Sequence, residues 1–460
     1  MLKILVLSFV LPLAAAERVD AIWSAGFVVP VDPSGRVIEN GAVAVKGERI
    51  VAVGTRAEIH AKYSAKTKLD KPNAILMPGF IDTHTHAAMV LFRGIADDMK
   101  LQDWLQNFIF PAEARNVNEE FVRWGTRLAC LEMVLSGTTT YTDMYYFEDA
   151  VAEETKAAGL RGVLGQTIIG FPAPDHKTPA AALAAAEKYI ARFKNDPLIV
   201  PAVAPHAIYT VADDVLRQTR ALANRTGAPV LIHLSETRRE NDDEMKKRGK
   251  SPTQILDGLG FFEGGRTLGA HGVWLDDADI ATLAKRKVGL AHCPSSNMKL
   301  ASGAARVVDI LAAGIDMGLG TDGFAGSNND AMLMEEMDLA AKLQKVTRLD
   351  ATALNAKQIV EMATITGARA LGLDREIGSL EPGKRADMII ISLDEPRATP
   401  MYNVYSQLVY ALKGSDVRDV MVNGRQIVKD RRVLTLNQAA IVAKAKEYKQ
   451  RVLASLKEKQ

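Results

Sequence analysis

Residues 78–86 read Pro-Gly-Phe-Ile-Asp-Thr-His-Thr-His and end an apolar run that begins at Ala74. The run predicts a buried β-strand, Ala74 to Ile81, followed by a loop that presents two histidines. In extended backbone, side chains two residues apart point the same way, so His84 and His86 can reach one metal ion. Because a chance pair among eight histidines is an equal alternative, the rest of the chain has to decide.

Short apolar runs alternate with longer helical patterns across residues 74–375. Eight of these runs predict strands: Ile75–Ile81, Thr138–Met144, Gly162–Ile168, Ile199–Ala204, Pro229–Leu234, Thr267–Ala270, Val288–Ala291 and Ile315–Gly320. Regular alternation predicts parallel pairing with right-handed crossovers, and eight such units fit a (β/α)8 barrel of the TIM type, in the α/β class. The alternative, a doubly wound open sheet, is disfavoured because no glycine-rich phosphate loop follows the first strand.

The two chain ends show a different pattern, with short strands separated by turns. Residues 17–73 and 376–435 together predict a smaller β-sandwich domain built from both ends. Residues 436–460 predict a charged C-terminal helix.

Residues 1–16 combine Lys3, an apolar segment and three alanines, which is typical of a signal peptide. An extra apolar strand or a misassigned start codon is the alternative. A cleaved chain would be exported or periplasmic, and an uncleaved one cytoplasmic.

Composition excludes several functional classes. The chain has 460 residues, of which 48% are hydrophobic and 24% charged, as in ordinary globular proteins. A formal net charge of +2 argues against nucleic-acid binding. Two cysteines, Cys130 and Cys293, give no disulfide framework, and no internal stretch is apolar for the length of a membrane span. We therefore expect a small-molecule partner. A homo-oligomer remains open.

In such a barrel the functional residues follow the carboxyl ends of the strands. Residues that can bind metal or move protons stand there: His84, His86, His206, His233, Glu236, His271, His292 and Asp322. Six of the eight histidines are among them. Histidines scattered through a core would not be placed so regularly, so we expect one shared site.

Three histidines and one carboxylate suit a divalent transition metal with one position left for water. We expect His84, His86, His233 and Asp322 to hold one ion, zinc in the first place, with iron or manganese as alternatives. A bound metal lowers the pKa of its water towards about 7 and provides a hydroxide at neutral pH. Asp322 beside that water can also take its proton.

Two more residues complete the expected catalytic set with Asp322. Glu236 follows His233 by three residues and can shuttle protons in the same cavity; its alternative is a surface glutamate that opens the polar run 238–250. His271 can hold the hydroxide or a developing negative oxygen. A neutral imidazole in that role needs a partner that fixes its tautomer.

Together these motifs resemble the amidohydrolase superfamily, over about Asp20 to Lys429. The resemblance rests on residues 78–86, His233 with Glu236, His271, His292–Asn297, Gly320–Gly323 and Gly378–Asp387. His206 stands after strand four, where no metal-bridging lysine is evident, and this resembles the mononuclear deaminase branch. Four further segments resemble the methylthioadenosine/S-adenosylhomocysteine deaminases in particular: Leu91–Gly94, Trp104-Leu105, Phe110–Arg115 and Thr142–Tyr145.

The resemblance implies a metal-dependent hydrolytic deaminase of an adenosine-like nucleoside such as methylthioadenosine. Metal-bound hydroxide would add to the ring carbon that bears the amine, while Glu236 protonates the adjacent nitrogen. His271 would steady the new oxygen, and Asp322 would relay a proton to the departing ammonia. Glu113 matches a glutamate that binds ribose hydroxyls, and His206 matches a substrate-contacting histidine. For Glu113, a helix-capping or salt-bridged carboxylate is the alternative.

The chain departs from this pattern after strand three, where some members hold a substrate carboxylate with two arginines. Gln166 stands at the first matching position, and the loop 169–179 contains Lys177 but no arginine. Because lysine cannot make the planar two-point contact of a guanidinium, S-adenosylhomocysteine is the less expected substrate.

Two other functions remain open at this point. One is a hydrolase of the same branch that acts on guanine, a triazine or a cyclic amide. The other is a non-catalytic barrel scaffold, which should have lost ligands. This chain keeps every expected ligand together with Glu236 and His271, so the scaffold is disfavoured.

Overall fold

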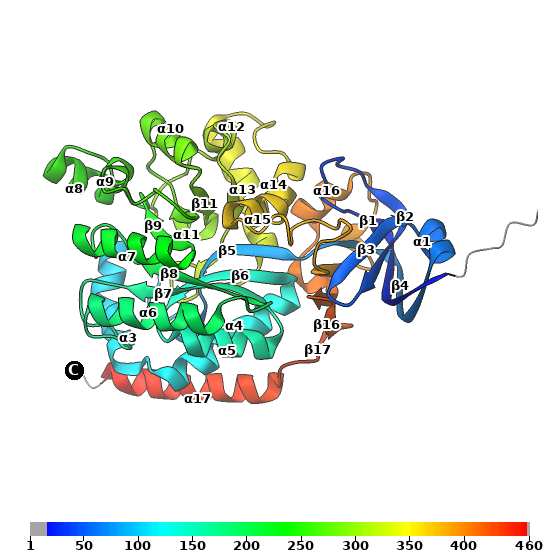
Figure 1. Ribbon diagram of the computed structural model, residues 1–460, viewed down its shortest axis with the longest axis horizontal. Coiled ribbons are helices and arrows are strands. Elements are labelled where there is room, and N and C mark those ends of the chain that lie inside the picture. The colour runs from blue at the N-terminus through cyan, green and yellow to red at the C-terminus, as the bar shows by residue number, and fades with distance from the viewer. Residues whose placement is uncertain (1–15, 458–460) are drawn as a thin grey trace, which may run out of the picture.

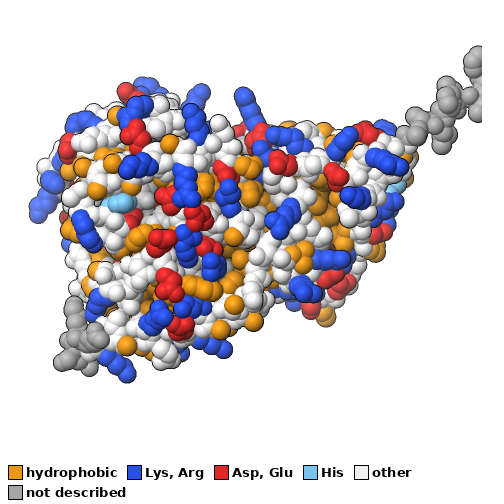
Figure 2. Space-filling model, turned by 60° about the horizontal axis from the view of Figure 1, so that its bottom comes forward, with side chains coloured by type: hydrophobic (Ala, Val, Ile, Leu, Met, Phe, Trp, Pro, Cys, Tyr) orange, Lys and Arg blue, Asp and Glu red, His pale blue; other side chains and the backbone are white. Residues whose placement is uncertain are grey.

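The structure, a computed structural model, describes residues 16–457 and consists of a helix-covered barrel with a second sheet beside it (Figure 1). The predicted signal peptide, residues 1–16, lies outside the described residues except for Ala16, so it stays a prediction. Among the described helices, none combines the length and the apolar character needed to cross a membrane. On the face in Figure 2, basic and acidic side chains are interspersed.

Eight parallel strand positions close into a barrel, which confirms the predicted fold class. They are β5 (Phe80–His86), β6 (Thr138–Tyr145), β7 (Arg161–Ile168), β8 (Ile199–Pro205), β9 (Val230–Leu234), β10 (Thr267–His271), β11 (Gly289–His292) and β12 (Met317–Leu319), with β13 (Asp322–Gly323) continuing the last position. Both β12 and β13 pair with β5 and thereby close the barrel. All residues of β6, β7, β9, β10 and β11 are buried, as expected for parallel strands covered on both faces.

The helices that cover the barrel follow its strands. They are α4 (Glu119–Ser136), α5 (Glu148–Ala158), α6 (Pro179–Phe193), α7 (Asp213–Thr226), α8 (Arg238–Arg248), α9 (Pro252–Gly258), α10 (Asp277–Arg286), α11 (Pro294–Lys299), α12 (Val307–Ala312), α13 (Leu333–Arg348), α14 (Ala356–Met362) and α15 (Ile365–Leu371). Their ends follow local sequence. Thr178 caps α6 and Pro179 opens it, while Gly137 ends α4 with a φ of 95° that other residues rarely adopt.

The two chain ends build one separate sheet. Its strands, in spatial order, are β17 (Arg432–Val433), β16 (Arg425–Lys429), β15 (Val417–Val422), β14 (Met388–Ser392), β4 (Tyr63–Pro78), β1 (Glu17–Val28), β2 (Ile38–Lys46) and β3 (Arg49–Thr55). N-terminal and C-terminal parts therefore meet where β4 pairs with β14. The short helix α1 (Arg56–Lys62) packs on this sheet, whereas α16 (Val404–Ser406), η4 (Gln407–Ala411) and η5 (Gly414–Asp416) contact helices of the barrel, and η3 (Pro396–Ala398) contacts η4.

The predicted first barrel strand, Ala74–Ile81, is in fact two strands. Its first part is the end of β4 and belongs to the separate sheet. After Gly79, β5 begins and runs to His86, so both histidines lie in the strand rather than in a loop. A Cβ at Gly79 would lie 2.1 Å from the Thr139 side chain. This close approach, where the chain passes from one sheet to the other, requires glycine.

One excursion, residues 87–117, passes over the carboxyl ends of the barrel strands, and we call it the cap segment. It contains η1 (Ala87–Phe92), α2 (Leu101–Trp104), η2 (Leu105–Ile109) and α3 (Phe110–Asn116). Trp104 Nε1 donates to the carbonyl of Ala325, 3.0 Å away, and ties the cap segment to the loop after β13. The C-terminal helix α17 (Gln438–Lys457) packs along α4 and ends beside α3 (Figure 1).

A buried ion pair joins the barrel to the separate sheet. Arg161 at the start of β7 places Nη2 3.0 Å from Oδ2 of Asp387, and the side chains are only 6% and 3% exposed. The Arg161 Nη1 also donates to the carbonyl of Pro197, and Asp387 Oδ1 accepts from the backbone N–H of Asn423. Removing one partner would leave the other charge buried without compensation.

We expect Arg161→Ala to destabilise the protein by about 3 kcal/mol, because the Asp387 carboxylate loses its partner away from water. Arg192→Ala is the matched control, since it breaks exposed ion pairs to Asp149 and Glu153 and should change stability little. Urea and thermal denaturation measure both. Equal losses in the two variants would contradict the structural role of the buried pair.

Candidate active site

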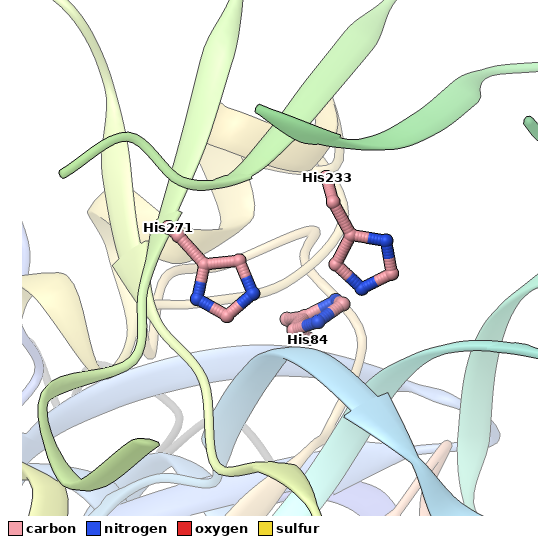
Figure 3. Close-up of side chains that lie close together, drawn as sticks. All are labelled: His84, His233 and His271. Atoms are coloured by element: carbon pink, nitrogen blue, oxygen red, sulfur yellow. The ribbon is translucent and has the colours of Figure 1, made fainter. Parts of the chain in front are cut away.

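The carboxyl ends of the barrel strands bring the expected metal ligands together. His84 and His86 come from β5, His233 from β9 and Asp322 from β13. Figure 3 shows the rings of His84, His233 and His271 turned towards one another. Ligand atoms of these three histidines lie within 4.8 Å of one another, and the same holds for His84, His86 and Asp322.

Backbone carbonyls decide which nitrogens of His86 and His233 face this centre. Nδ1 of His86 lies 2.7 Å from the oxygen of Met144, and Nδ1 of His233 lies 2.7 Å from the oxygen of His206. Because a carbonyl only accepts, each Nδ1 carries the proton and each Nε2 of a neutral ring carries a lone pair. The two Nε2 atoms lie 3.2 Å apart. Two lone pairs at that distance repel each other unless a cation lies between them.

His84 and Asp322 complete a donor set for such a cation. The buried Nε2 of His84 has no hydrogen-bond partner among the described residues, and Asp322 Oδ1 lies 3.3 Å from it. Burial lowers the pKa of His84 to about 4, so its ring is neutral at pH 7. Burial raises the pKa of the Asp322 carboxyl, but its contact with His84, and the charge that neighbouring imidazoles carry when protonated, lower that pKa well below its usual range. Three neutral imidazoles and a carboxylate fit a divalent transition metal.

Three residues at this centre have left-handed backbone: Ser235, His271 and Asp322, with φ of 47°, 73° and 63°. Residues other than glycine rarely adopt this conformation, and those that do are often found at functional sites. At the first of these bends, the Glu240 carboxylate accepts from the N–H groups of Ser235 and Glu236, at 3.3 and 2.8 Å. These three residues lie where the strand ends meet the cavity, and at Ser235 the hydrogen bonds to Glu240 stabilise the bend.

Glu236 faces His271 across the centre, with 3.9 Å between Oε2 and Nε2. Burial, together with the Asp322 carboxylate, raises the pKa of Glu236 well above its usual range. This shift favours the protonated form of the side chain, which can donate a hydrogen bond, and the burial of Glu236 contradicts the polar-surface alternative. Nδ1 of His271 lies 3.1 Å from Oδ1 of Asn297. This amide oxygen accepts from Nδ1–H, so the Nε2 lone pair faces Glu236.

One cavity holds nearly all of the predicted site residues. Its polar lining includes His86, Glu113, His206, His233, Glu236, His271 and Asp322. His84 does not line it but is buried beside these groups. The cap segment supplies an apolar wall through Met89, Leu101, Trp104, Leu105, Ile109 and Phe110. The cavity is thus polar at the metal centre and apolar towards the cap segment.

Glu113, on α3, is buried at the cap side of the cavity. The Tyr145 hydroxyl donates to its Oε1 at 2.7 Å, and the Tyr146 hydroxyl lies 3.5 Å from its Oε2. Burial raises the pKa of Glu113 to about 7, while the two hydroxyls oppose that rise. Among the described residues this carboxyl forms no ion pair, so the salt-bridge alternative is wrong for this structure.

His206 lies next to the metal centre and borders the cavity. Its ring centroid is 4.8 Å from that of His233, and its Nδ1 lies 2.9 Å from the Thr210 hydroxyl. Burial lowers the pKa of His206 to about 3. The ring is therefore neutral and faces the cavity without adding charge.

The loop after β7 contributes no cation to the cavity. Gln166 Nε2 donates to the Asp175 carboxylate at 2.8 Å, and Lys177 Nζ donates to the carbonyl of Ala173 at 2.9 Å. Neither side chain borders the cavity, and among the described residues its lining includes no arginine or lysine. The sequence predicted that no arginine after strand three would bind a substrate carboxylate. In the structure the lining of the whole cavity lacks a cationic side chain among the described residues.

Four partners in this site carry roles that the sequence did not reveal. Tyr145 and Tyr146 hold Glu113, Asn297 holds His271, and the Ser296 hydroxyl donates to Asp322 Oδ2 at 2.6 Å. All four stand at or just after predicted strand ends. Their position after strand ends could have marked them as candidates for the site. It does not indicate which side chain each of them contacts.

Comparison with known proteins assigns the chain to a family. The model described as "Amidohydrolase family" matches residues 75–427. The chain belongs to the amidohydrolase family. The predicted superfamily is thereby confirmed. A second model, described as an imidazolonepropionase-like composite domain of bacteria, matches residues 41–63 in the separate sheet.

Named relatives of this amidohydrolase cover nearly its whole length. A 5-methylthioadenosine/S-adenosylhomocysteine deaminase from Syntrophus aciditrophicus is 46% identical, over 96% of this chain and 99% of the relative. A 5'-deoxyadenosine deaminase from Methanosarcina acetivorans is 40% identical, over 95% and 99%. The structure of an adenosine deaminase from Xanthomonas campestris with bound zinc has a TM-score of 0.94 and 39% identity, and covers 96% of this chain and 100% of that one.

We expect His233→Ala to lower the metal content of this amidohydrolase well below one ion per chain, because one of the facing imidazoles is removed. Glu236→Gln should keep the full metal content, since the carboxyl of Glu236 is outside the donor set. His176→Ala, a histidine away from the cavity, is the control. Elemental analysis after dialysis measures all three. Undiminished metal in the His233→Ala protein would contradict the assigned centre.

Proposed function

We propose that this chain is a hydrolytic deaminase that replaces the ring amine of an adenosine-like nucleoside with oxygen and releases ammonia. The observation that carries the proposal is one cavity in which a metal donor set faces the buried Glu236, with Glu113 at its other end. The named activities of the relatives at 46% and 40% identity support the same reaction.

Four residues would hold the metal: His84, His86, His233 and Asp322. We propose one zinc ion, since three neutral imidazoles and a carboxylate suit it, and iron or manganese are the alternatives. When bound, the ion would supply an activated water for attack on the ring carbon. Asp322 stays ionised in this environment, so it can accept a proton from that water and pass it to the leaving amine.

Glu236 and His271 act on different atoms next to the reacting carbon in this proposal. Glu236 donates its proton to the ring nitrogen next to that carbon, which makes the carbon more electrophilic. His271, held by Asn297, directs a lone pair at the centre and accepts a hydrogen bond from the attacking water.

The other end of the cavity recognises the sugar. The Glu113 carboxylate can accept hydrogen bonds from the two ribose hydroxyls, and His206 contacts the substrate beside the centre. Apolar side chains of the cap segment surround the space that remains. An uncharged 5' substituent, as in adenosine, 5'-deoxyadenosine or methylthioadenosine, fits this wall. The carboxylate of S-adenosylhomocysteine would be desolvated there without a cationic partner.

We expect zinc-loaded enzyme to release ammonia rapidly from adenosine, 5'-deoxyadenosine or methylthioadenosine. For S-adenosylhomocysteine, kcat/KM should be lower by a factor of about 10 or more, because a buried carboxylate would be left unpaired. Guanine and cytosine complete the panel, and Glu236→Gln is the inactive control.

Two results of this panel would count against the proposal. Equal rates with S-adenosylhomocysteine would refute the preference for uncharged 5' substituents. No release from any nucleoside would refute the deaminase function and would favour a triazine or a cyclic amide as substrate.

We expect the KM for adenosine to fall as the pH rises through about 7. The pKa of Glu113 in the free enzyme is about 7, so the carboxyl is protonated below that pH and ionised above it. Only the ionised form can accept from both ribose hydroxyls, so binding weakens at low pH. Initial rates between about pH 6 and 8 measure this. Glu113→Gln should remove the dependence, and an unchanged profile in that variant would contradict the role of Glu113.

A further inference from the structure

The helix that carries Glu113 is held from two sides. On the cavity side, the hydroxyls of Tyr145 and Tyr146 hold the Glu113 carboxyl. On the outer side, the last turns of α17 reach the end of α3. Arg115 Nη1 donates to the carbonyl of Ser455 at 2.9 Å, and Asn116 Nδ2 donates to the Ser455 hydroxyl at 2.9 Å.

The C-terminal helix is itself anchored on the barrel. The Tyr448 ring packs against Phe121 of α4 in an edge contact, with 5.3 Å between centroids. Tyr448 and Val452 are buried, and Lys444 pairs with Glu120 at 3.2 Å. Figure 1 shows α17 lying along the outside of the barrel with its end beside α3. Ser455 is therefore presented by an anchored helix.

Helix α3 depends on such outside contacts for its position. It has seven residues, too few for a stable isolated helix. The cap segment before it contains short helices only, and several of its polar ties, such as Trp104 to Ala325, Lys299 to Asp97 and Arg93 to Glu132, lie upstream of α3. The contacts of Arg115 and Asn116 with Ser455 fix the downstream end.

We propose that Ser455 is a positioning residue for ribose recognition. By holding Arg115 and Asn116, it sets the distance between α3 and the metal centre, and thus the place of Glu113 beside the ribose hydroxyls. The inference rests on the proposed function of Glu113. Ser455 touches no substrate and acts through Glu113 alone. Loss of the hydrogen bonds at Ser455 should therefore raise the KM for substrates with ribose hydroxyls and leave kcat nearly unchanged.

The test compares adenosine with 2',3'-dideoxyadenosine, which lacks both hydroxyls, on full-length zinc-loaded enzyme. Arg115→Ala/Ser455→Ala removes both hydrogen bonds between α17 and α3. We expect it to raise the KM for adenosine roughly 10-fold, as for the loss of two hydrogen bonds. The KM for the dideoxynucleoside and both kcat values should change less than about twofold.

Two further variants make the test specific. Combined with Glu113→Gln, the loss of the Ser455 contacts should cause no additional rise in KM, because the two changes act through one carboxyl. Lys449→Ala is the control on α17. Its exposed side chain makes no hydrogen bond or ion pair with the described part of the chain, and its KM values should equal wild type. Asn116→Ala probes the contact from the side of α3 should the double variant fold poorly.

The outcomes separate this inference from the proposed function. A KM that rises equally for both nucleosides, or that stays unchanged in the Ser455 variant, overturns the inference. If Glu113→Gln alone raises the KM for adenosine in that case, the role of Glu113 survives and only the positioning role of Ser455 fails. If Glu113→Gln leaves the KM for adenosine unchanged, both fail together.

Discussion

The pairing of the first barrel strand with the last is the constraint on which the site depends. Leu319 pairs with Asp82, and Asp322 pairs with Thr85. The buried Asp82 carboxylate reinforces this closure, because it accepts from both the N–H and the hydroxyl of Thr321, at 3.1 and 2.6 Å. Ligands on β5 and the carboxylate on β13, far apart in sequence, meet only through this pairing. A barrel left open here would have no complete donor set.

Within the closed barrel, hydrogen bonds from the scaffold fix protonation states as well as positions. Carbonyls at the ends of β6 and β8 hold the proton on Nδ1 of His86 and His233. The amide of Asn297 does the same for His271. Burial raises the pKa of Glu236 well above its usual range, whereas the pKa of Asp322 lies well below its own. The same low-dielectric cavity thus holds one carboxyl as an acid and another as a base, which is what a reaction with one proton donor and one proton acceptor requires.

The sequence predicted the barrel, the family and the residues that gather in the cavity, because parallel strands place functional groups at a fixed edge. The predicted strand Ala74–Ile81 was wrong at Gly79, because the apolar run continues across the point where the chain passes from the separate sheet to the barrel. The sequence also could not supply pairings such as Tyr145 with Glu113 or Ser455 with Asn116. These contacts depend on how helices and loops pack after the chain has folded, and neither periodicity nor spacing records that geometry.

The pairing of β4 with β14 has a consequence for synthesis on the ribosome. One edge of β4 pairs with β14, which begins at Met388. This edge stays unpaired while the ribosome translates the whole barrel. At 5–20 residues per second, this interval lasts roughly 15–60 s. During this interval the nascent chain carries an apolar strand with unpaired backbone groups, a template for wrong association. A chaperone that covers this edge until β14 has been synthesised would prevent such association.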